Sequence, residues 1–176
     1  MKGKRLTTLW KGEGLSTAGF HERLTDYVQA EQQSIYRLAY SYAGNEQDAL
    51  DIVQSALVKA LTARPMRQPQ YLRTWVYRIV VNTALDWLRA GHREVSVDLD
   101  ELDLAQADDP STEPDLHRTL ERLPPDLRTI VVLRFFEDLP LAEIAEITRL
   151  NLNTVKTRLY RGLELMRIQM EAEGHD

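Results

Sequence analysis

The stretch "LAEIAEITRLNLNTVKTRLYRGLELM", residues 141–166, decides the fold because two amphipathic helical patterns meet in it across a short turn. The first pattern places apolar side chains on one helical face: Leu141, Ile144, Ala145 and Ile147. Asn151 is suited to cap the second helix, and Leu150 and Val155 are spaced to form a hydrophobic staple around that cap. Two helices joined by a turn of about three residues predict a helix-turn-helix.

The second helix of this pair has two chemically different sides. One side, which we expect to face the core, carries Leu152, Val155, Leu159, Leu163 and Met166. The other side carries Asn153, Lys156, Thr157, Tyr160, Arg161 and Glu164. Lys, Arg, Asn and Thr are side chains that read base edges in the major groove of DNA. A merely solvated helix face remains an alternative, but one acid among six outward residues favours the DNA-reading interpretation.

The charges of the chain are segregated. A net charge of −5 over 176 residues argues by itself against a nucleic-acid partner. Residues 94–115, however, hold nine acids and no Lys or Arg, and subtracting these nine charges leaves +4 for the rest. Residues 59–93 carry seven basic residues against one acid, and residues 149–167 carry five against one. The chain therefore has two basic blocks separated by an acidic connector, which the average charge hides.

This organisation predicts an all-α protein of two small helical domains. We expect a disordered segment at 1–19, a helical bundle at 20–93, a flexible acidic linker at 94–115, and a helix-turn-helix domain at 116–172. The apolar periodicity and the turn residues predict helices at 22–43, 46–63, 69–91, 116–123, 125–136, 140–148 and from 152 onward. Each domain has only about 60–75 residues, a size at which a single core is marginal, so docking onto a partner should matter for both.

The helix predicted at 69–91 interleaves aromatic with basic side chains. The aromatic residues are Tyr71, Trp75, Tyr77 and Trp87, and the basic residues in and just beyond the helix are Arg73, Arg78, Arg89 and Arg93. Basic groups follow phosphates while aromatic rings stack on bases, as single-stranded nucleic-acid binding requires. Thr74, Arg78, Asn82 and Arg89 share one helical face, on which an Asn flanked by Arg could address an unstacked base. We expect the two tryptophans to lie in the core.

The segment "DALDIVQSALVKAL", residues 48–61, has two faces of a different kind. Apolar residues recur at helical spacing at Leu50, Val53, Leu57 and Leu61. A second face combines Asp51, Gln54, Ser55 and Val58, a small polar surface with an exposed Val that suits a partner helix. Taken alone, this second face fits an ordinary solvent-exposed surface better.

Catalytic and metal-binding patterns are missing from the sequence. The chain has no Cys, which removes disulfides and thiolate metal sites, and its four His lie in unrelated contexts. We find no glycine-rich phosphate loop and no nucleophile elbow. We therefore predict no catalytic residue, no metal, no cofactor and no enzymatic activity. Without a signal peptide or a long apolar run, we expect a cytoplasmic protein that does not insert into a membrane.

Three segments together resemble the extracytoplasmic-function (ECF) sigma factors. "YRLAYSYAGNEQDALDIVQSALVKAL" (36–61) resembles the entry into their conserved region 2, and "YLRTWVYRIVVNTALDWLR" (71–89) resembles their promoter-melting and −10-reading helix. "LERLPPDLRTIVVLRFFEDLPLAEIAEITRLNLNTVKTRLYRGLELMR" (120–167) resembles their region 4. The segments occur in the family order, with a linker of fitting length, and cover most of the chain.

The resemblance implies a subunit that binds core RNA polymerase, directs it to a promoter and helps to open the duplex. The clamp helices of the largest polymerase subunit would bind Asp51 and Gln54, with Ser55 and Val58 on the same face, and the flap of the second-largest subunit would be a further contact. Ser55 stands where the family often has an acid. Single-stranded DNA at −10 would be read by Asn82, with Trp75, Arg78 and Arg89 nearby.

In region 4 the resemblance assigns duplex contacts at the −35 element. Base-reading positions are matched by Lys156, Thr157, Tyr160 and Arg161, whereas Thr154 and Arg158 would contact phosphates and Asn153 lies beside them. Arg149 stands where the family usually has Gly, and Asn151 and Asn153 stand where it often has Pro and Gly. The −35 sequence preference therefore cannot be transferred from the family.

The family further implies a membrane-bound anti-sigma factor as inhibitor and a role in a stress response. Two other interpretations compete with it. A free-standing helix-turn-helix repressor or activator would explain 140–172 but leaves 71–91 and Asp51 without a role. An anti-sigma or scaffold protein that binds only protein conflicts with the two basic blocks.

Overall fold

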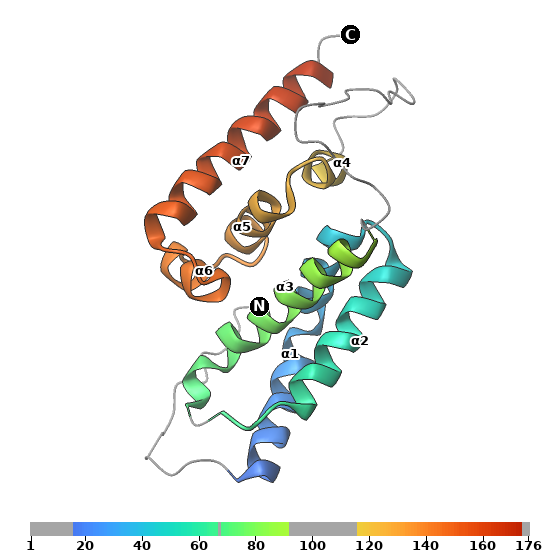
Figure 1. Cartoon of the computed structure of the whole chain (residues 1–176), viewed down its shortest axis with the longest axis vertical. Coiled ribbons are helices and arrows are strands. Elements are labelled where there is room, and N and C mark those ends of the chain that lie inside the picture. The colour runs from blue at the N-terminus through green and yellow to red at the C-terminus, as the bar shows by residue number, and fades with distance from the viewer. Residues whose placement is uncertain (1–15, 67, 92–115, 174–176) are drawn as a thin grey trace.

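The computed structural model describes residues 16–66, 68–91 and 116–173, and all regular elements within them are helical (Figure 1). The first domain contains α1 (Thr17–Ala43), α2 (Glu46–Thr62), the 3-10 turn η1 (Pro69–Tyr71) and α3 (Leu72–Gly91). The second domain contains α4 (Leu116–Glu121), α5 (Pro125–Phe135), α6 (Leu141–Thr148) and α7 (Leu152–Glu173). The predicted all-α architecture is confirmed, whereas the linker predicted at 94–115 lies outside the described residues.

The first helix begins earlier than its apolar pattern predicts. α1 starts at Thr17, so the expectation that the chain is disordered through residue 19 is wrong for its last three residues. Ser16 explains the early start, because its Oγ accepts a hydrogen bond from the backbone N–H of Gly19 at 3.2 Å. Phe20 and Leu24 are buried and anchor this first part of the helix. Residues 1–15 lie outside the described part of the chain.

The turn between α1 and α2 depends on Gly44. This residue closes α1 in the left-handed conformation, with φ of 71°, and its N–H donates to the carbonyl of Tyr40. Asn45 then caps α2 by accepting from the N–H of Asp48 at 3.0 Å. A Cβ on Gly44 would lie 2.7 Å from Oε1 of Glu121 on α4. The turn is therefore tied to glycine by its backbone conformation, whereas the flexible end of the Glu121 side chain can move away from a Cβ.

We predict that Gly44→Ala lowers the free energy of unfolding by about 1–2 kcal/mol, because a Cβ is disfavoured at positive φ. Urea denaturation followed by circular dichroism measures this change. Gly91→Ala is the control, because a Cβ there meets no atom within 4 Å. Equal stability of the two variants would show that Gly44 has no conformational role.

The buried face of α2 consists of three alanines and one isoleucine and not of its leucines. Ala49, Ile52, Ala56 and Ala60 are buried, whereas Leu50 and Leu61 are 42% and 49% exposed. Small side chains at a helix contact allow the helix axes to come close together, and α2 packs in this way against both α1 and α3. Of the apolar stripe that marked this helix in the sequence, Leu50 and Leu61 are exposed, whereas Val53 and Leu57 are half-buried.

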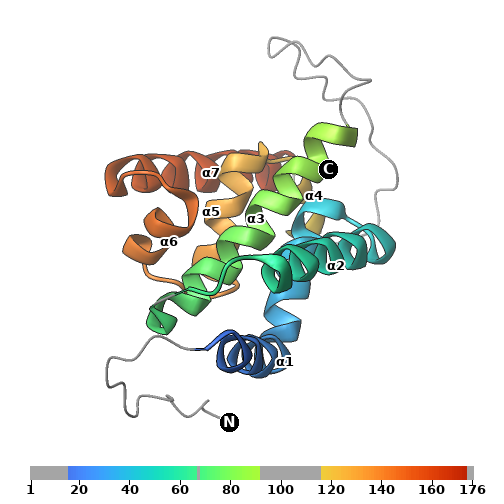
Figure 2. The same cartoon turned by 60° about the horizontal axis from the view of Figure 1, so that its bottom comes forward.

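The two domains pack against each other, and one hydrophobic core runs through both. α3 contacts α6, and α1 contacts α4 and α5, while α2 and α7 lie on opposite outer sides (Figures 1 and 2). Tyr42 of α1 is buried and bonds to the hydroxyl of Thr129 on α5. Because the Thr129 hydroxyl already donates to the Pro125 carbonyl, Tyr42 is the donor. We call this packing of the two domains the closed arrangement.

Across the three described stretches, no helix combines the length and the apolar character needed to cross a lipid bilayer.

Candidate nucleic-acid interface

The helix-turn-helix is formed by α6, a three-residue turn and α7. α6 ends at Thr148 and is followed by Arg149, whose backbone is left-handed with φ of 58° and whose N–H donates to the Ala145 carbonyl. Asn151 then caps α7, because its Oδ1 accepts from the N–H of Thr154 at 2.8 Å and from its hydroxyl at 3.0 Å. The Asn151 cap predicted from the sequence is therefore confirmed. The cap fixes where the polar face of α7 begins.

Arg149 occupies a conformation that glycine adopts at little cost and other residues adopt with strain. The helix-turn-helix forms with Arg149 at this position. Burial and the nearby charge of Arg149 both lower the pKa of the Arg78 guanidinium on α3. The two arginines therefore lie close to each other, and Arg149 brings the turn additional positive charge at a conformational cost.

We predict that Arg149→Gly raises the free energy of unfolding by up to about 1 kcal/mol, because the left-handed strain of a residue with a Cβ is relieved. Thermal denaturation is the measurement. Arg149→Ala removes the same charge but keeps the strain, so it should not reproduce the gain. If both variants were stabilised equally, charge and not backbone strain would be the cause.

The core side of α7 agrees with the sequence except at its first residue. Val155, Leu159 and Met166 are buried and Leu163 is half-buried. Leu152 was predicted to face the core and is instead 40% exposed. As the first residue of α7 it lies beyond the end of the packed stripe, at the rim of a cleft that also includes Asn151 and Thr154.

The predicted base-reading face of α7 is open. Asn153, Lys156, Thr157, Tyr160 and Arg161 are all exposed, with Tyr160 exposed over 70% of its surface. The only acid on this face, Glu164, is held by two hydrogen bonds from Arg167, at 3.1 and 2.7 Å. These bonds lower the pKa of the Glu164 carboxyl and compensate its charge. The face consequently presents donors and positive charge to its surroundings.

Beside this face lies a cleft of about 780 Å³ between the start of α5 and the start of α7. Arg158 lines it and forms an ion pair with Asp126 at 3.3 Å. Thr154, Thr157 and Arg161 also line the cleft. Its donors match a phosphodiester, and Arg158 has to exchange Asp126 for a phosphate to bind one.

The residues predicted for −10 DNA are distributed along α3. Trp75 is half-buried and packs edge-on against Phe20, with ring centroids 5.7 Å apart, so it supports the core more than it offers a stacking surface. Asn82 and Arg89 are exposed, and Arg89 pairs with Asp86 at 3.2 Å. Arg78 instead turns to the second domain, where its Nη2 donates to the Glu146 carbonyl at 2.6 Å. Asn82 and Arg89, at one end of the predicted face, are therefore accessible, whereas Arg78 toward the other end is bonded to the second domain.

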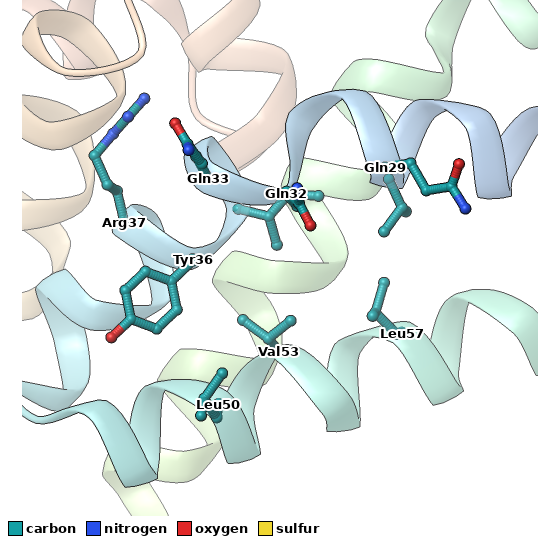
Figure 3. A pocket seen from close by; sticks show the side chains of 10 residues that line it. Gln29, Gln32, Gln33, Tyr36, Arg37, Leu50, Val53 and Leu57 are labelled. Atoms are coloured by element: carbon teal, nitrogen blue, oxygen red, sulfur yellow. The ribbon is translucent and has the colours of Figure 1, made fainter.

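The predicted polymerase-binding face of α2 is exposed at all four positions: Asp51, Gln54, Ser55 and Val58. Next to it lies a groove of about 620 Å³ between α1 and α2, which the sequence reading did not identify (Figure 3). Leu50, Val53 and Leu57 line its α2 side and point toward α1. In the sequence, the signal for this groove was the row formed by Leu50, Val53 and Leu57. Large apolar residues beside the buried alanine positions of a helix line its surface grooves.

Comparison with known proteins identifies the family. Residues 27–94 match sigma-70 region 2, and residues 114–166 match sigma-70 region 4. RNA polymerase sigma factor SigV of Bacillus subtilis (strain 168) is 46% identical over 153 residues, which are 85% of this chain and 92% of the relative. The ECF RNA polymerase sigma-E factor of Escherichia coli (strain K12) is 35% identical over 135 residues, 66% of this chain and 71% of that protein. The chain belongs to the ECF sigma factors of the sigma-70 family.

Two solved structures of other proteins share the fold of this sigma factor. The sigma factor RpoE of Bartonella quintana, solved in complex with the anti-sigma factor NepR, has a TM-score of 0.63 at 19% identity and covers 85% of this chain and 98% of its own. CnrH, solved in complex with the cytosolic domain of CnrY, has a TM-score of 0.61 at 20% identity over 89% of this chain and 92% of its own. The resemblance seen in the sequence is therefore confirmed, and the chain is a protein of transcription initiation.

Proposed function

We propose that this sigma factor binds core RNA polymerase, brings it to promoters that carry −35 and −10 elements, and assists the opening of the −10 duplex. One observation carries the proposal most directly. A single chain exposes the donor-rich face of α7 on one domain, and Asn82 and Arg89 of α3 together with a partner face on α2 on the other. A repressor would need only the first of these surfaces.

At the −35 element, α7 enters the major groove with its outward face. Lys156, Thr157, Tyr160 and Arg161 contact base edges in this arrangement, which suits side chains that project from the first turns of a recognition helix. Asn153, Thr154 and Arg158, which also line the cleft beside this face, bind the phosphate backbone. The phosphate contacts set the position of the helix, and the base contacts select the sequence.

At the −10 element, α3 binds the non-template strand after the duplex has opened. Asn82 is exposed and can bond to the edge of an extruded base, while Arg89 neutralises the backbone beside it. Trp75 supports this site through its contact with Phe20. Arg78 completes the site once it leaves the Glu146 carbonyl.

Polymerase binds to the exposed face of α2 in the first domain. Asp51, Gln54, Ser55 and Val58 dock on the clamp helices of the largest subunit, and the groove lined by Leu50 supplies apolar area at the edge of this contact. The flap of the second-largest subunit contacts the second domain. These contacts supply the partner that two domains of this size need.

A regulatory partner also follows from the comparisons. Two sigma factors of the same fold were solved with partners, one of which is named as an anti-sigma factor. We propose that this chain, too, is held inactive by an anti-sigma factor that is anchored in the membrane, and that it acts in the cytoplasm in response to stress. The sigma factor itself needs no metal or cofactor for this role.

Run-off transcription with purified core polymerase tests the proposed function. The template is the promoter region of the gene that encodes this protein. We predict that promoter-specific transcripts from it appear only when the protein is added. Core polymerase alone is the control. Tight binding of duplex DNA by the isolated protein, without any transcript in the presence of polymerase, would contradict the proposal and favour a free-standing repressor or activator.

We predict that Arg161→Ala weakens recognition of the −35 element by about 1–3 kcal/mol, because a bidentate contact between a guanidinium and a base is lost. Run-off yields from promoters that differ only at −35 measure the effect. Arg64→Ala is the control, because Arg64 is exposed in the first domain and belongs to none of the predicted DNA-binding or polymerase-binding faces. A uniform loss on all promoters would assign Arg161 to a phosphate.

A further inference from the structure

Leu152, the first residue of α7, is an apolar side chain in polar surroundings. The cleft that it lines is otherwise formed by Asp126, by amides and hydroxyls of the first turns of α7, and by Arg158 and Arg161. Leu127, the other leucine along this cleft, is only 4% exposed, whereas Leu152 is 40% exposed. Among the described residues that line the cleft, Leu152 is therefore the one exposed apolar side chain.

The cap of α7 holds Leu152 in this position. Oδ1 of Asn151 accepts from the N–H of Thr154 at 2.8 Å and from its hydroxyl at 3.0 Å, which fixes the first turn of the helix. Val155, three residues after Leu152, is fully buried and anchors the same turn to the core. Leu150, on the other side of the cap, is half-buried against the core. The backbone at Leu152 is consequently held from both sides.

Helix geometry directs this side chain toward the DNA that α7 would read. In an α-helix each Cα–Cβ bond tilts toward the N-terminus, so a side chain at the first position projects past the helix end. In a helix-turn-helix, the N-terminal residues of the second helix contact the base edges in the major groove. Asn153 and Thr157, which belong to the reading face, line the same cleft. Leu152 therefore lies beside base-reading side chains.

The chemistry of a leucine narrows what it can contact in the groove. Base edges in the major groove present hydrogen-bond donors and acceptors, with one apolar exception, the C5-methyl group of thymine. Leucine neither donates nor accepts a hydrogen bond, whereas phosphates are bound by charged and polar groups such as those around it in the cleft. Contact with a thymine methyl removes the apolar surface of both partners from water.

We infer that Leu152 is a specificity-determining residue that reads the C5-methyl group of a thymine in the −35 element. The inference rests on the proposed binding of α7 in the major groove, and it adds selection by apolar contact to selection by hydrogen bonds. Because Leu152 precedes Asn153, Lys156 and Arg161 on the helix, this thymine lies at the edge of the element that the start of α7 reads. The −35 element therefore contains an A·T pair at that edge.

Uracil lacks only the methyl group of thymine and keeps its hydrogen-bonding groups, so it tests the inference directly. Run-off transcription with core polymerase and the full chain is measured on the promoter region described above, at limiting sigma factor. Each thymine of the −35 element, on either strand, is replaced in turn by uracil. We expect one replacement to lower the transcript yield about fourfold, because the burial of one methyl group is lost.

Leu152→Ala should abolish this dependence on the methyl group. It should lower the yield from the thymine template by a similar factor and use the thymine and uracil templates equally. Leu152→Met keeps a large apolar side chain and should retain the dependence. Ile168→Ala is the control, because Ile168 is 50% exposed on the same helix but lies about 24 Å further along it. This control should leave the yield and the response to uracil as in wild type.

The outcomes separate this inference from the proposed function. If wild-type protein with core polymerase fails to initiate on the thymine template, the proposed function is wrong and the inference falls with it. If it initiates and uses every uracil template as well as the thymine template, no methyl group is read, and the inference is wrong while the function stands. The inference is also wrong if Leu152→Ala loses yield but keeps the wild-type response to uracil, because Leu152 then contacts another part of the DNA.

Discussion

The burial of one carboxylate constrains the rest of this structure. Glu137 sits outside regular secondary structure, yet it is bonded by Tyr77 and Arg37, which lie 60 and 100 positions away in the chain. A carboxylate without these partners would have to return to water. The relative position of the domains is therefore specified by polar groups with defined directions, in addition to a shared apolar core that could tolerate sliding.

Two small domains that share a core can also be separated more easily than the halves of one large domain. Each has a size at which a single core is marginal, so each gains from any surface that covers it. In the closed arrangement that surface is the other domain. In the proposed working state, polymerase and DNA take over this role. The sigma factor thus exchanges one set of partners for another, and the exposed apolar side chains of α2 are ready for the second set.

Local chemistry explains why much of the architecture was predictable. Caps and turn residues such as Asn151 and Gly44 determine helix ends within a few residues, and the donor-rich face of α7 follows from spacing alone. Where the prediction failed, packing decided. Leu152, which was expected in the core, lies beyond the end of the packed stripe and is 40% exposed.

The closed arrangement could not be predicted from the sequence. Nothing in the local pattern around Glu137 distinguishes it from the exposed Asp138 beside it. The distinction depends on contacts between segments far apart in the chain, and helical periodicity carries no information about such contacts. Likewise, the sequence shows Arg78 only as one of several basic residues on α3, and its hydrogen bond to α6 is evident only in the folded chain.

We expect the two domains of this sigma factor to pack together in the free protein and to contact −35 and −10 DNA separately once polymerase and promoter are bound. Double electron–electron resonance measures the distance between spin labels at Gln47→Cys on α2 and Ala172→Cys on α7. Both positions are exposed, and the chain has no other Cys. We expect a single narrow distance distribution for the free protein and a distribution at longer distances after core polymerase and promoter are added. The same distribution in both samples would contradict it.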